Sequence, residues 1–186
     1  MNLVIHTIGH STHSIEDFIG LLKAHSIGAL VDVRTVPRSR HVPQFNKGSL
    51  EQKLAAAGIR YVHMKELGGW RRPRADSPNT GWRSAGFRGY ADYMLTAEFD
   101  AAISQLIGLA QHERVAIMCA EAVPRRCHRS LIADALTVRG VEVRHIMGAG
   151  EATPHELTDF AKVDGVRITY PATSLSPEQP ALDMPR

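Results

Sequence analysis

The sequence predicts an α/β protein with a single domain: an open, doubly wound, mostly parallel sheet of about five strands with helices on both faces. Short apolar runs alternate along the chain with segments of helical periodicity. These runs are apolar throughout, which is typical of parallel strands that are buried on both faces. With 186 residues, 44% of them hydrophobic, the chain has room for one ordinary core.

Each predicted element has its own local signal. Apolar, β-branched runs predict the strands, at residues 3–8, 28–33, 59–64, 115–118 and 141–147. Helical spacing of apolar residues predicts a helix that begins near Ser14, and further helices at 49–57, 90–96, 97–111 and 130–139. We expect the domain to cover residues 1–170. The Pro- and Ser-rich residues 171–186 have little to bury, so we expect a flexible tail.

The ends of the chain and its cysteines bear on location. No apolar run approaches the roughly 18 residues that a membrane span needs. The first ten residues lack the basic segment of a signal peptide, so we expect a cytoplasmic protein that does not bind membranes. The two cysteines are then expected to be reduced. Oligomeric state and cofactors are not indicated by the sequence.

Positive charge is concentrated in three stretches. Residues 34–47, 65–88 and 119–129 contain 13 of the 22 Lys and Arg residues but 3 of the 19 Asp and Glu residues, and most of these cations are Arg. Arg favours two-pronged contact with phosphate or carboxylate. All three stretches connect a strand to a helix, as do residues 9–13, so we expect them to meet at the edge where the parallel strands end. The alternative explanation for this concentration of Arg is that the three stretches are exposed loops, where Arg is tolerated without a function.

The strongest local signal is the segment from Cys119 to Arg129. Cys119 ends a predicted strand, and the helix that follows is expected to start near Cys127–Ser130. A helix N-terminus and nearby Arg residues favour a thiolate, so Cys119 is a candidate nucleophile or redox thiol. His128 or His10 is then the candidate base, and Glu121 the residue that orients it. An inert cysteine that caps a buried strand is the alternative.

The same residues also permit a metal site. Cys119, Cys127 and His128, joined by His10, supply the sulfur and nitrogen ligands that zinc prefers. The two cysteines are separated by seven residues, not by the two to four residues of a structural zinc knuckle, so the sequence does not identify a metal. Isolated histidines such as His155 are interpreted as surface residues.

Several residues are candidates for binding an anion, either a phosphate-bearing small molecule or a nucleic acid. They lie in the predicted strand-to-helix loops: Gly9, Ser11, Arg34, Arg38, Arg125 and Arg129. Asp32 either points to the edge, toward a ribose or Arg38, or faces inward and pairs with an Arg. Trp70, Trp82 and Phe87 lie among Arg residues, a pattern that suits stacking on bases beside phosphates. A nucleic-acid-binding module without catalysis is therefore an alternative function, and a lid packed on the domain is an alternative structure for this loop.

The chain resembles the bacterial and archaeal family known as domain of unknown function 488. The resemblance rests on TIGHST (7–12), VDVRTVPRSR (31–40) with Phe45, GIRYVHMKELGG (58–69), YADYM (90–94) and the C-x-E-x-x-P-x-x-C-H-R string at 119–129. It implies one compact domain with these loops at one site, and it supplies no reaction. Val123 departs from the acid expected before the proline, so any role of that acid in relatives is not carried over.

A looser similarity links the chain to rhodanese-like domains. They also show a D-V-R sequence, and a later order of strand, Cys, short loop, Arg, helix, Gly and strand. Here 86 residues separate Asp32 from Cys119, and the loop after the cysteine carries Glu and Pro instead of glycine. We treat this similarity as an analogy of pattern.

Overall fold

The computed structural model describes residues 3–172. Nearly all of the predicted C-terminal tail lies outside the described residues. No helix within residues 3–172 has the length and apolar character needed to cross a membrane.

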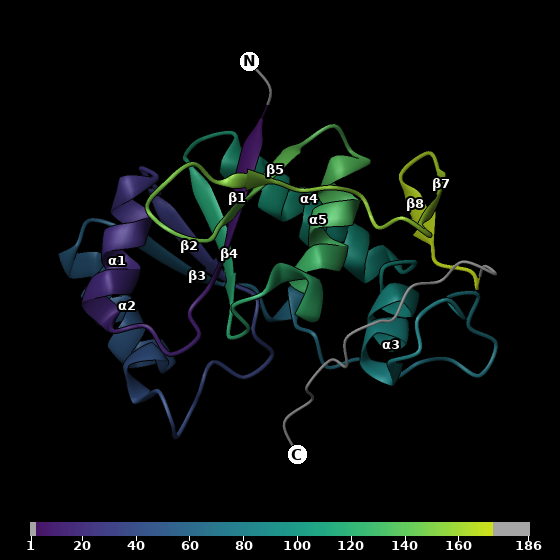
Figure 1. Cartoon of the computed structure of the whole chain (residues 1–186), viewed down its shortest axis with the longest axis horizontal. Coiled ribbons are helices and arrows are strands. Elements are labelled where there is room, and N and C mark those ends of the chain that lie inside the picture. Colours follow the sequence, from purple (N-terminus) through teal and green to yellow (C-terminus); the bar gives the residue numbers. More distant parts are fainter. Residues whose placement is uncertain (1–2, 173–186) are drawn as a thin grey trace.

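A six-stranded mixed sheet forms the centre of the molecule (Figure 1). Its strand order is β3-β2-β4-β1-β5-β6; neighbouring strands are parallel except β6, which runs antiparallel to β5. The strands are β1 (Val4–Gly9), β2 (Ala29–Asp32), β3 (Arg60–His63), β4 (Val115–Cys119), β5 (Glu142–Ile146) and β6 (Thr153–Pro154). The predicted mostly parallel sheet is confirmed. Outside it, β7 (Lys162–Asp164) and β8 (Arg167–Thr169) form a separate small hairpin.

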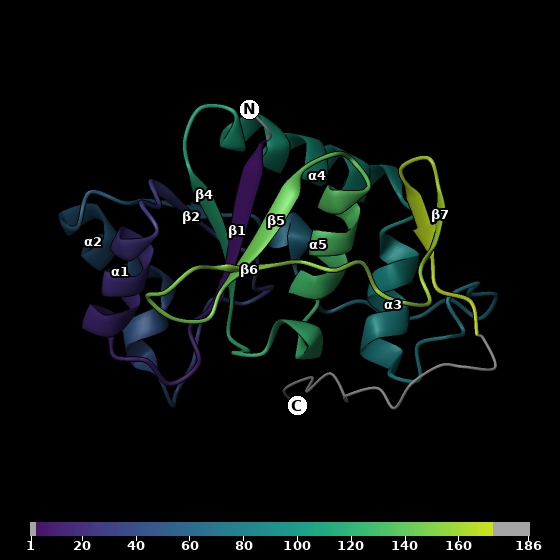
Figure 2. The ribbon, with the colours of Figure 1, turned by 45° about the horizontal axis from the view of Figure 1, so that its top comes forward.

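Helices cover both faces of the sheet, as predicted. They are α1 (Ile15–Ala24), α2 (Lys47–Ala56), α3 (Ala85–Tyr93), α4 (Ala97–Ala110) and α5 (Arg129–Thr137), with short 3-10 turns η1 (Pro43–Phe45), η2 (Lys65–Leu67) and η3 (Pro124–Arg126). In Figures 1 and 2, α1 and α2 lie on one side of the strands, whereas α3, α4 and α5 lie on the other.

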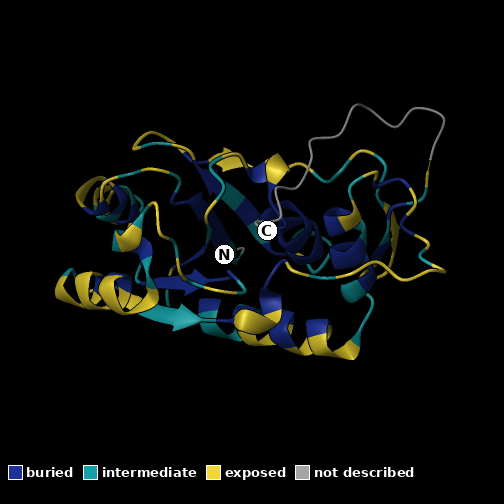
Figure 3. Ribbon diagram, turned by 90° about the horizontal axis from the view of Figure 1, so that it is seen from below, coloured by how far each residue is buried: buried dark blue, intermediate teal, exposed yellow. Residues whose placement is uncertain are grey.

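Side-chain alternation along the strands produces the two cores. In β2, Leu30 packs in the cluster that includes Leu22 of α1 and Leu50 of α2, whereas its neighbour Val31 packs in the cluster that includes Phe99 of α4. Successive residues of a strand point to opposite faces, so an apolar residue at every position is needed to bury both. The central strands β2 and β4 are therefore mostly buried, whereas the edge strand β3 is only partly buried and the helices expose residues on their outer sides (Figure 3).

The elements differ from the predicted ones mainly at their ends. Helix α3 begins at Ala85, five residues earlier than predicted, because the Ser84 hydroxyl accepts a hydrogen bond from the Phe87 amide and caps the helix. The strands β6, β7 and β8 were not predicted, since two or three residues are too few to show a period.

The connections diverge at the carboxyl ends of β1 and β4. These two strands are neighbours, yet the chain leaves β1 toward α1 on one face and leaves β4 toward α5 on the other. Such a switch of direction is where open α/β sheets usually bind ligands. Gly9 and Cys119, the last residues of the two strands, are paired at this point.

Candidate functional site

The loops after β1 and β4 stay in contact beyond the sheet. The His10 amide donates to the Cys119 carbonyl at 3.0 Å, and the Ser11 amide donates to the Ala120 carbonyl at 2.9 Å. A Cβ atom on Gly9 would lie 2.0 Å from the Glu121 carbonyl oxygen, so only glycine fits there. The Glu121 backbone thus covers Gly9, and the Ser11 amide is already bonded within the protein.

Two cysteines and one histidine converge beside this loop. We call Cys119, Cys127 and His128 the Cys/His cluster; their ligand atoms all lie within 4.8 Å of one another. The His128 Nδ1 atom is 3.6 Å from the Cys127 sulfur and 4.0 Å from the Cys119 sulfur. Cys127 and His128 are buried, and Cys119 keeps some exposure as a residue. Among residues 3–172, this is the one group of three or more His, Cys, Asp or Glu with such spacing.

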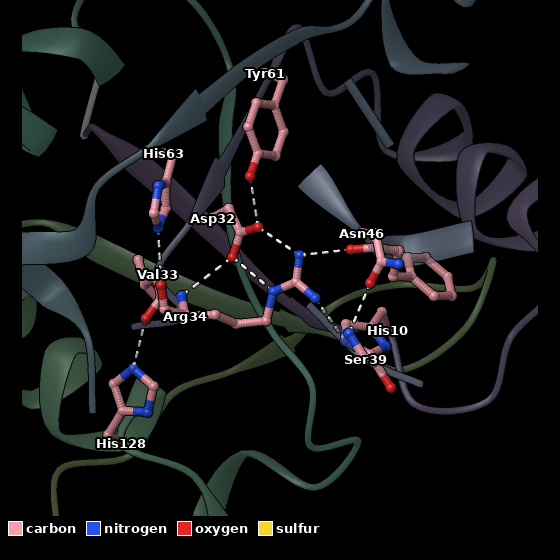
Figure 4. A network of polar contacts seen from close by, with 10 residues as sticks. His10, Asp32, Val33, Arg34, Ser39, Asn46, Tyr61, His63 and His128 are labelled. Atoms are coloured by element: carbon pink, nitrogen blue, oxygen red, sulfur yellow. Dashed lines mark hydrogen bonds and ion pairs between the residues drawn. The ribbon is translucent and has the colours of Figure 1, made fainter. Parts of the chain in front are cut away.

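The histidine of the cluster is oriented by the backbone. Its Nε2 atom lies 3.1 Å from the Val33 carbonyl oxygen, as Figure 4 shows. A carbonyl only accepts hydrogen bonds, so Nε2 carries a hydrogen, and Nδ1 is the ring atom that faces the two sulfurs. This arrangement of a backbone acceptor behind the ring is the usual support of a metal-binding histidine.

Backbone amides support both sulfurs in the same way. The Arg129 amide donates to the Cys127 sulfur at 3.5 Å, and the Glu121 amide donates to the Cys119 sulfur. In each case the donor lies two residues after the cysteine. Amides that point at sulfur stabilise a thiolate, the form that binds metals and acts as a nucleophile.

The surroundings shift the pKa values of the two cysteines in opposite directions. The hydrogen bond that Cys119 donates to Cys127, together with burial, raises the pKa of Cys119 well above that of a free thiol. Burial also acts to raise the pKa of Cys127, but the bond from Cys119 and the charges around it outweigh burial and hold that pKa well below the usual value. The sequence analysis named Cys119 as the candidate thiolate, and Cys127 is the sulfur whose pKa is lowered.

The His128 ring of the Cys/His cluster is closely packed against Gly69 and Tyr90. The Gly69 backbone lies against the His128 ring, where an added Cβ would be 2.6 Å from Nδ1. The Tyr90 ring lies 5.1 Å from the His128 ring, and its hydroxyl donates to the Leu67 carbonyl at 2.9 Å. The loop before α3 therefore fixes the position of the imidazole.

A second polar network lies at the end of β2 (Figure 4). Arg34 makes a two-pronged ion pair with the fully buried Asp32, at 2.9 and 2.6 Å, and the Tyr61 hydroxyl donates to the same carboxylate at 2.7 Å. Asp32 therefore faces inward and pairs with an Arg, one of the two alternatives that the sequence left open. Arg34 is 7% exposed, and its charge is neutralised within the protein.

His10 lies beside Arg34 and outside the Cys/His cluster. Its Nδ1 donates to the Ser11 carbonyl at 2.9 Å, which leaves Nε2 to accept from Arg34 at 3.3 Å. Burial, and to a smaller extent the Arg34 charge, lower the pKa of His10 to about 4, so the ring is neutral at physiological pH. Its 2% exposure and these bonds describe a packed side chain; the four-ligand version of the metal site, with His10, does not assemble.

The remaining candidate anion-binding residues occupy different environments. Arg129 is fully buried; it donates to the Thr7 hydroxyl and the Glu121 carbonyl, and no ion pair involves it among residues 3–172. Arg38 is exposed, and Arg125 is exposed beside Glu156. The Glu121 carboxylate accepts from the Val123 amide at 3.0 Å and is not part of the Cys/His cluster.

The aromatic side chains of residues 65–88 are mostly internal. Trp82 and Phe87 are buried and stack on each other at 4.6 Å, whereas Trp70 is 47% exposed. Arg71 lies 3.6 Å over the Tyr93 ring, and Arg74 pairs with Asp76. This loop is thus packed on the domain, with Trp70 as its exposed aromatic residue.

One buried network was missed by the sequence analysis. Asp134 accepts hydrogen bonds from His155, Thr158 and Tyr170, and His155 also bonds to His145. His155 was interpreted as a surface residue, but its side chain is 6% exposed. No motif marks these residues, since they come from α5, β5 and the last described segment of the chain.

The fold and the Cys/His cluster define a doubly wound α/β protein with thiol and imidazole groups at the carboxyl ends of its strands. The family model described as domain of unknown function DUF488 matches residues 14–136, and the chain belongs to this family. No curated protein and no solved structure gave a match.

Proposed function

We propose that this protein binds a zinc ion through Cys119, Cys127 and His128, with the fourth coordination position open to water or a substrate. The observation that carries the proposal is the convergence of three ligand atoms within 4.8 Å, with His128 Nδ1 directed at both sulfurs. Sulfur and imidazole ligands suit zinc, and catalytic zinc sites typically keep three protein ligands and one exchangeable position.

The backbone amides beside the Cys/His cluster favour the thiolate form of both cysteines, the form that binds a metal ion. The Arg129 charge lies in the interior without a carboxylate partner among the described residues, and it favours the thiolate form of both cysteines. A divalent ion replaces the proton that the two sulfurs share and satisfies the Nδ1 lone pair of His128 at the same time. The centre would supply a Lewis acid able to lower the pKa of a bound water.

Metal analysis of protein purified without a histidine tag tests this proposal. We expect about one equivalent of zinc, and at least a tenfold lower content in Cys119→Ser, Cys127→Ser and His128→Gln, because a carboxamide or hydroxyl is a poor zinc ligand. His112→Ala, which removes an exposed histidine outside the Cys/His cluster, is the control and should retain zinc. Folded protein that takes up no zinc in a micromolar titration would overturn the proposal.

A second candidate function is thiol chemistry without a metal. It is favoured by the hydrogen bond between the two sulfurs and by the low pKa of Cys127. In chelator-treated protein this candidate predicts rapid alkylation of one cysteine at neutral pH, located by peptide mass spectrometry. If one equivalent of zinc does not slow the alkylation, thiol chemistry is preferred over the metal centre.

Binding of an anionic ligand or a nucleic acid stays a prediction. The exposed residues that support it are Arg38, Arg125 and Trp70, while Arg34 and Arg129 are bonded in the interior. Single-stranded oligonucleotides should then bind at low salt with an affinity that falls steeply as salt rises. Absence of binding at low salt would remove this candidate.

A further inference from the structure

A pocket of about 540 Å³ lies beside the N-terminal end of α5. Its walls come from the loop before α3, from η3 and the start of α5, from the end of β5 and from residues 153–160. Figure 2 shows α5 next to β5, with β6 crossing close by. None of the Cys/His cluster residues lines this pocket, which we call the side pocket. Its volume is in the range of small-molecule binding sites.

The floor of the side pocket, formed by Ser130, His145, His155 and Thr158, rests on a buried chain of hydrogen bonds. Asp134 Oδ1 bonds to His155 Nε2 at 2.8 Å, and His155 Nδ1 bonds to His145 Nε2 at 3.0 Å. His145 Nδ1 bonds to the Thr7 hydroxyl at 2.7 Å, and Arg129 donates to that hydroxyl at 3.1 Å. Both ring nitrogens of His145 and both of His155 therefore have hydrogen-bond partners, whichever tautomer each ring adopts.

The other polar groups of the floor are bonded as well. The Thr158 hydroxyl donates to Asp134 at 2.7 Å, and the Ser130 hydroxyl donates to the Cys127 carbonyl at 2.9 Å. Burial, followed by the neighbouring His155, lowers the pKa of His145 to about 4, so that this ring is neutral. A polar group placed on this floor would lose its water without gaining a partner, which costs free energy. The part of a ligand that lies on this floor is therefore apolar. In the wall, the buried Trp82 Nε1 has no partner among the described residues and can donate one hydrogen bond to a ligand.

The walls of the side pocket are aromatic and aliphatic. Trp82 and Phe160 meet edge to face, with their ring centroids 4.8 Å apart. Val123 is 42% exposed and Met147 is 57% exposed, and both line the side pocket. These two are among the few large hydrophobic residues exposed in residues 3–172. Burying them against an apolar ligand is favourable by the hydrophobic effect.

The rim carries more negative than positive charge. Arg125 and Glu156 face each other at 3.7 Å, and both are about four-fifths exposed. Asp159 is exposed and lines the same side pocket. Two carboxylates against one guanidinium leave a net negative rim, which attracts a cation.

We propose that the side pocket binds a small amphipathic organic cation. Its apolar body, of about the size of an aromatic ring system, lies against Trp82 and Phe160, and its ammonium group lies at the rim near Glu156 and Asp159. The proposal is independent of the zinc centre, because no residue of the Cys/His cluster lines the side pocket.

Two probes with the same body and opposite charge test the proposal: tryptamine and indole-3-acetate. Binding to the full chain is measured by ligand-observed NMR and by calorimetry at low and high salt. We expect tryptamine to bind about fivefold more tightly at low salt, with a smaller ratio at high salt, since the rim charges are exposed and screened. Failure of both probes to bind at millimolar concentration, or tighter binding of indole-3-acetate, would overturn it.

Surface variants locate the binding. Met147→Lys puts a cation and a long side chain on the wall, and we expect at least a fivefold loss of tryptamine affinity. Met147→Leu keeps the wall apolar and should stay within about twofold. Val166→Lys makes the same charge change at a residue that is 49% exposed and does not line the side pocket, so it is the matched control. Equal affinities for the Met147→Lys and Val166→Lys variants would contradict the assignment.

Discussion

Substituting Gly69 by alanine tests whether the position of the His128 ring governs metal binding. The added Cβ would lie 2.6 Å from Nδ1, 2.9 Å from Cγ and 3.0 Å from Cε1 of His128. Ordinary contact begins near 3.4 Å, so the ring has to retreat by about 0.8 Å. Its Nε2 is anchored on the Val33 carbonyl, which limits how it can move.

A movement of this size exceeds what a zinc site tolerates. Zinc–nitrogen distances in proteins vary by about 0.2 Å around their usual values. We therefore expect the Gly69→Ala variant to bind zinc about 10- to 100-fold more weakly. Losses of this size are typical when a group that orients a metal-binding side chain is removed. The backbone of Gly69 does not lie in the left-handed region, so alanine adds no backbone strain of its own.

The assay is a competition titration of zinc against a chromophoric chelator, with thermal unfolding measured in parallel. Gly108→Ala is the matched control, because its Cβ on α4 would meet nothing within 4 Å. Its zinc affinity should equal that of the wild type within about twofold. A folded Gly69→Ala variant with unchanged zinc affinity would refute the reasoning that the Gly69 backbone sets the ring position.

Three further predictions concern stability, each measured by denaturant unfolding. Asp134→Ala leaves the donors of Thr158 and Tyr170 buried without an acceptor, and should cost about 3 kcal/mol or more; a loss below 1 kcal/mol would contradict the role of this carboxylate. Arg34→Met leaves a buried, unpaired Asp32 and should cost about 3–5 kcal/mol of stability, and adding Asp32→Asn should recover about 2 kcal/mol of that loss. If the stability losses of the two single variants simply add in the double variant, the ion pair does not stabilise the fold. Gly9→Ala brings a Cβ within 2.0 Å of a carbonyl and should prevent folding or cost more than about 3 kcal/mol; near-wild-type stability would show that the loop over β1 moves freely.

Much of the fold could be predicted because its signals are local. Apolar runs such as Val115–Met118 and the helical spacing from Phe99 to Ala110 are visible within a few residues, and they became β4 and α4. Helix α3 was placed too late because its cap at Ser84 follows a long loop with no apolar period. The short β6 joins the sheet through its pairing with β5, which no local pattern shows.

The candidate site was predictable in its residue types but not in its partners. Cys119, Cys127 and His128 share one short segment, so their proximity follows from a single strand-to-helix turn. The Val33 carbonyl that orients His128 comes from the residue that follows β2, 95 residues earlier. Asp134, His145 and His155 were missed for the same reason, since each is an ordinary polar residue until the fold brings them together.

The sequence by itself determined the class of fold and the chemical groups at the carboxyl edge. Hydrophobic periodicity, capping residues and the eleven-residue string at 119–129 all depend on neighbours along the chain. Only the tertiary structure decided which arginines are bonded in the interior, which groups surround the two sulfurs and where the side pocket opens. Burial and hydrogen bonding are properties of the three-dimensional surroundings, and the free energy of a buried charge depends on partners that lie far away in the sequence.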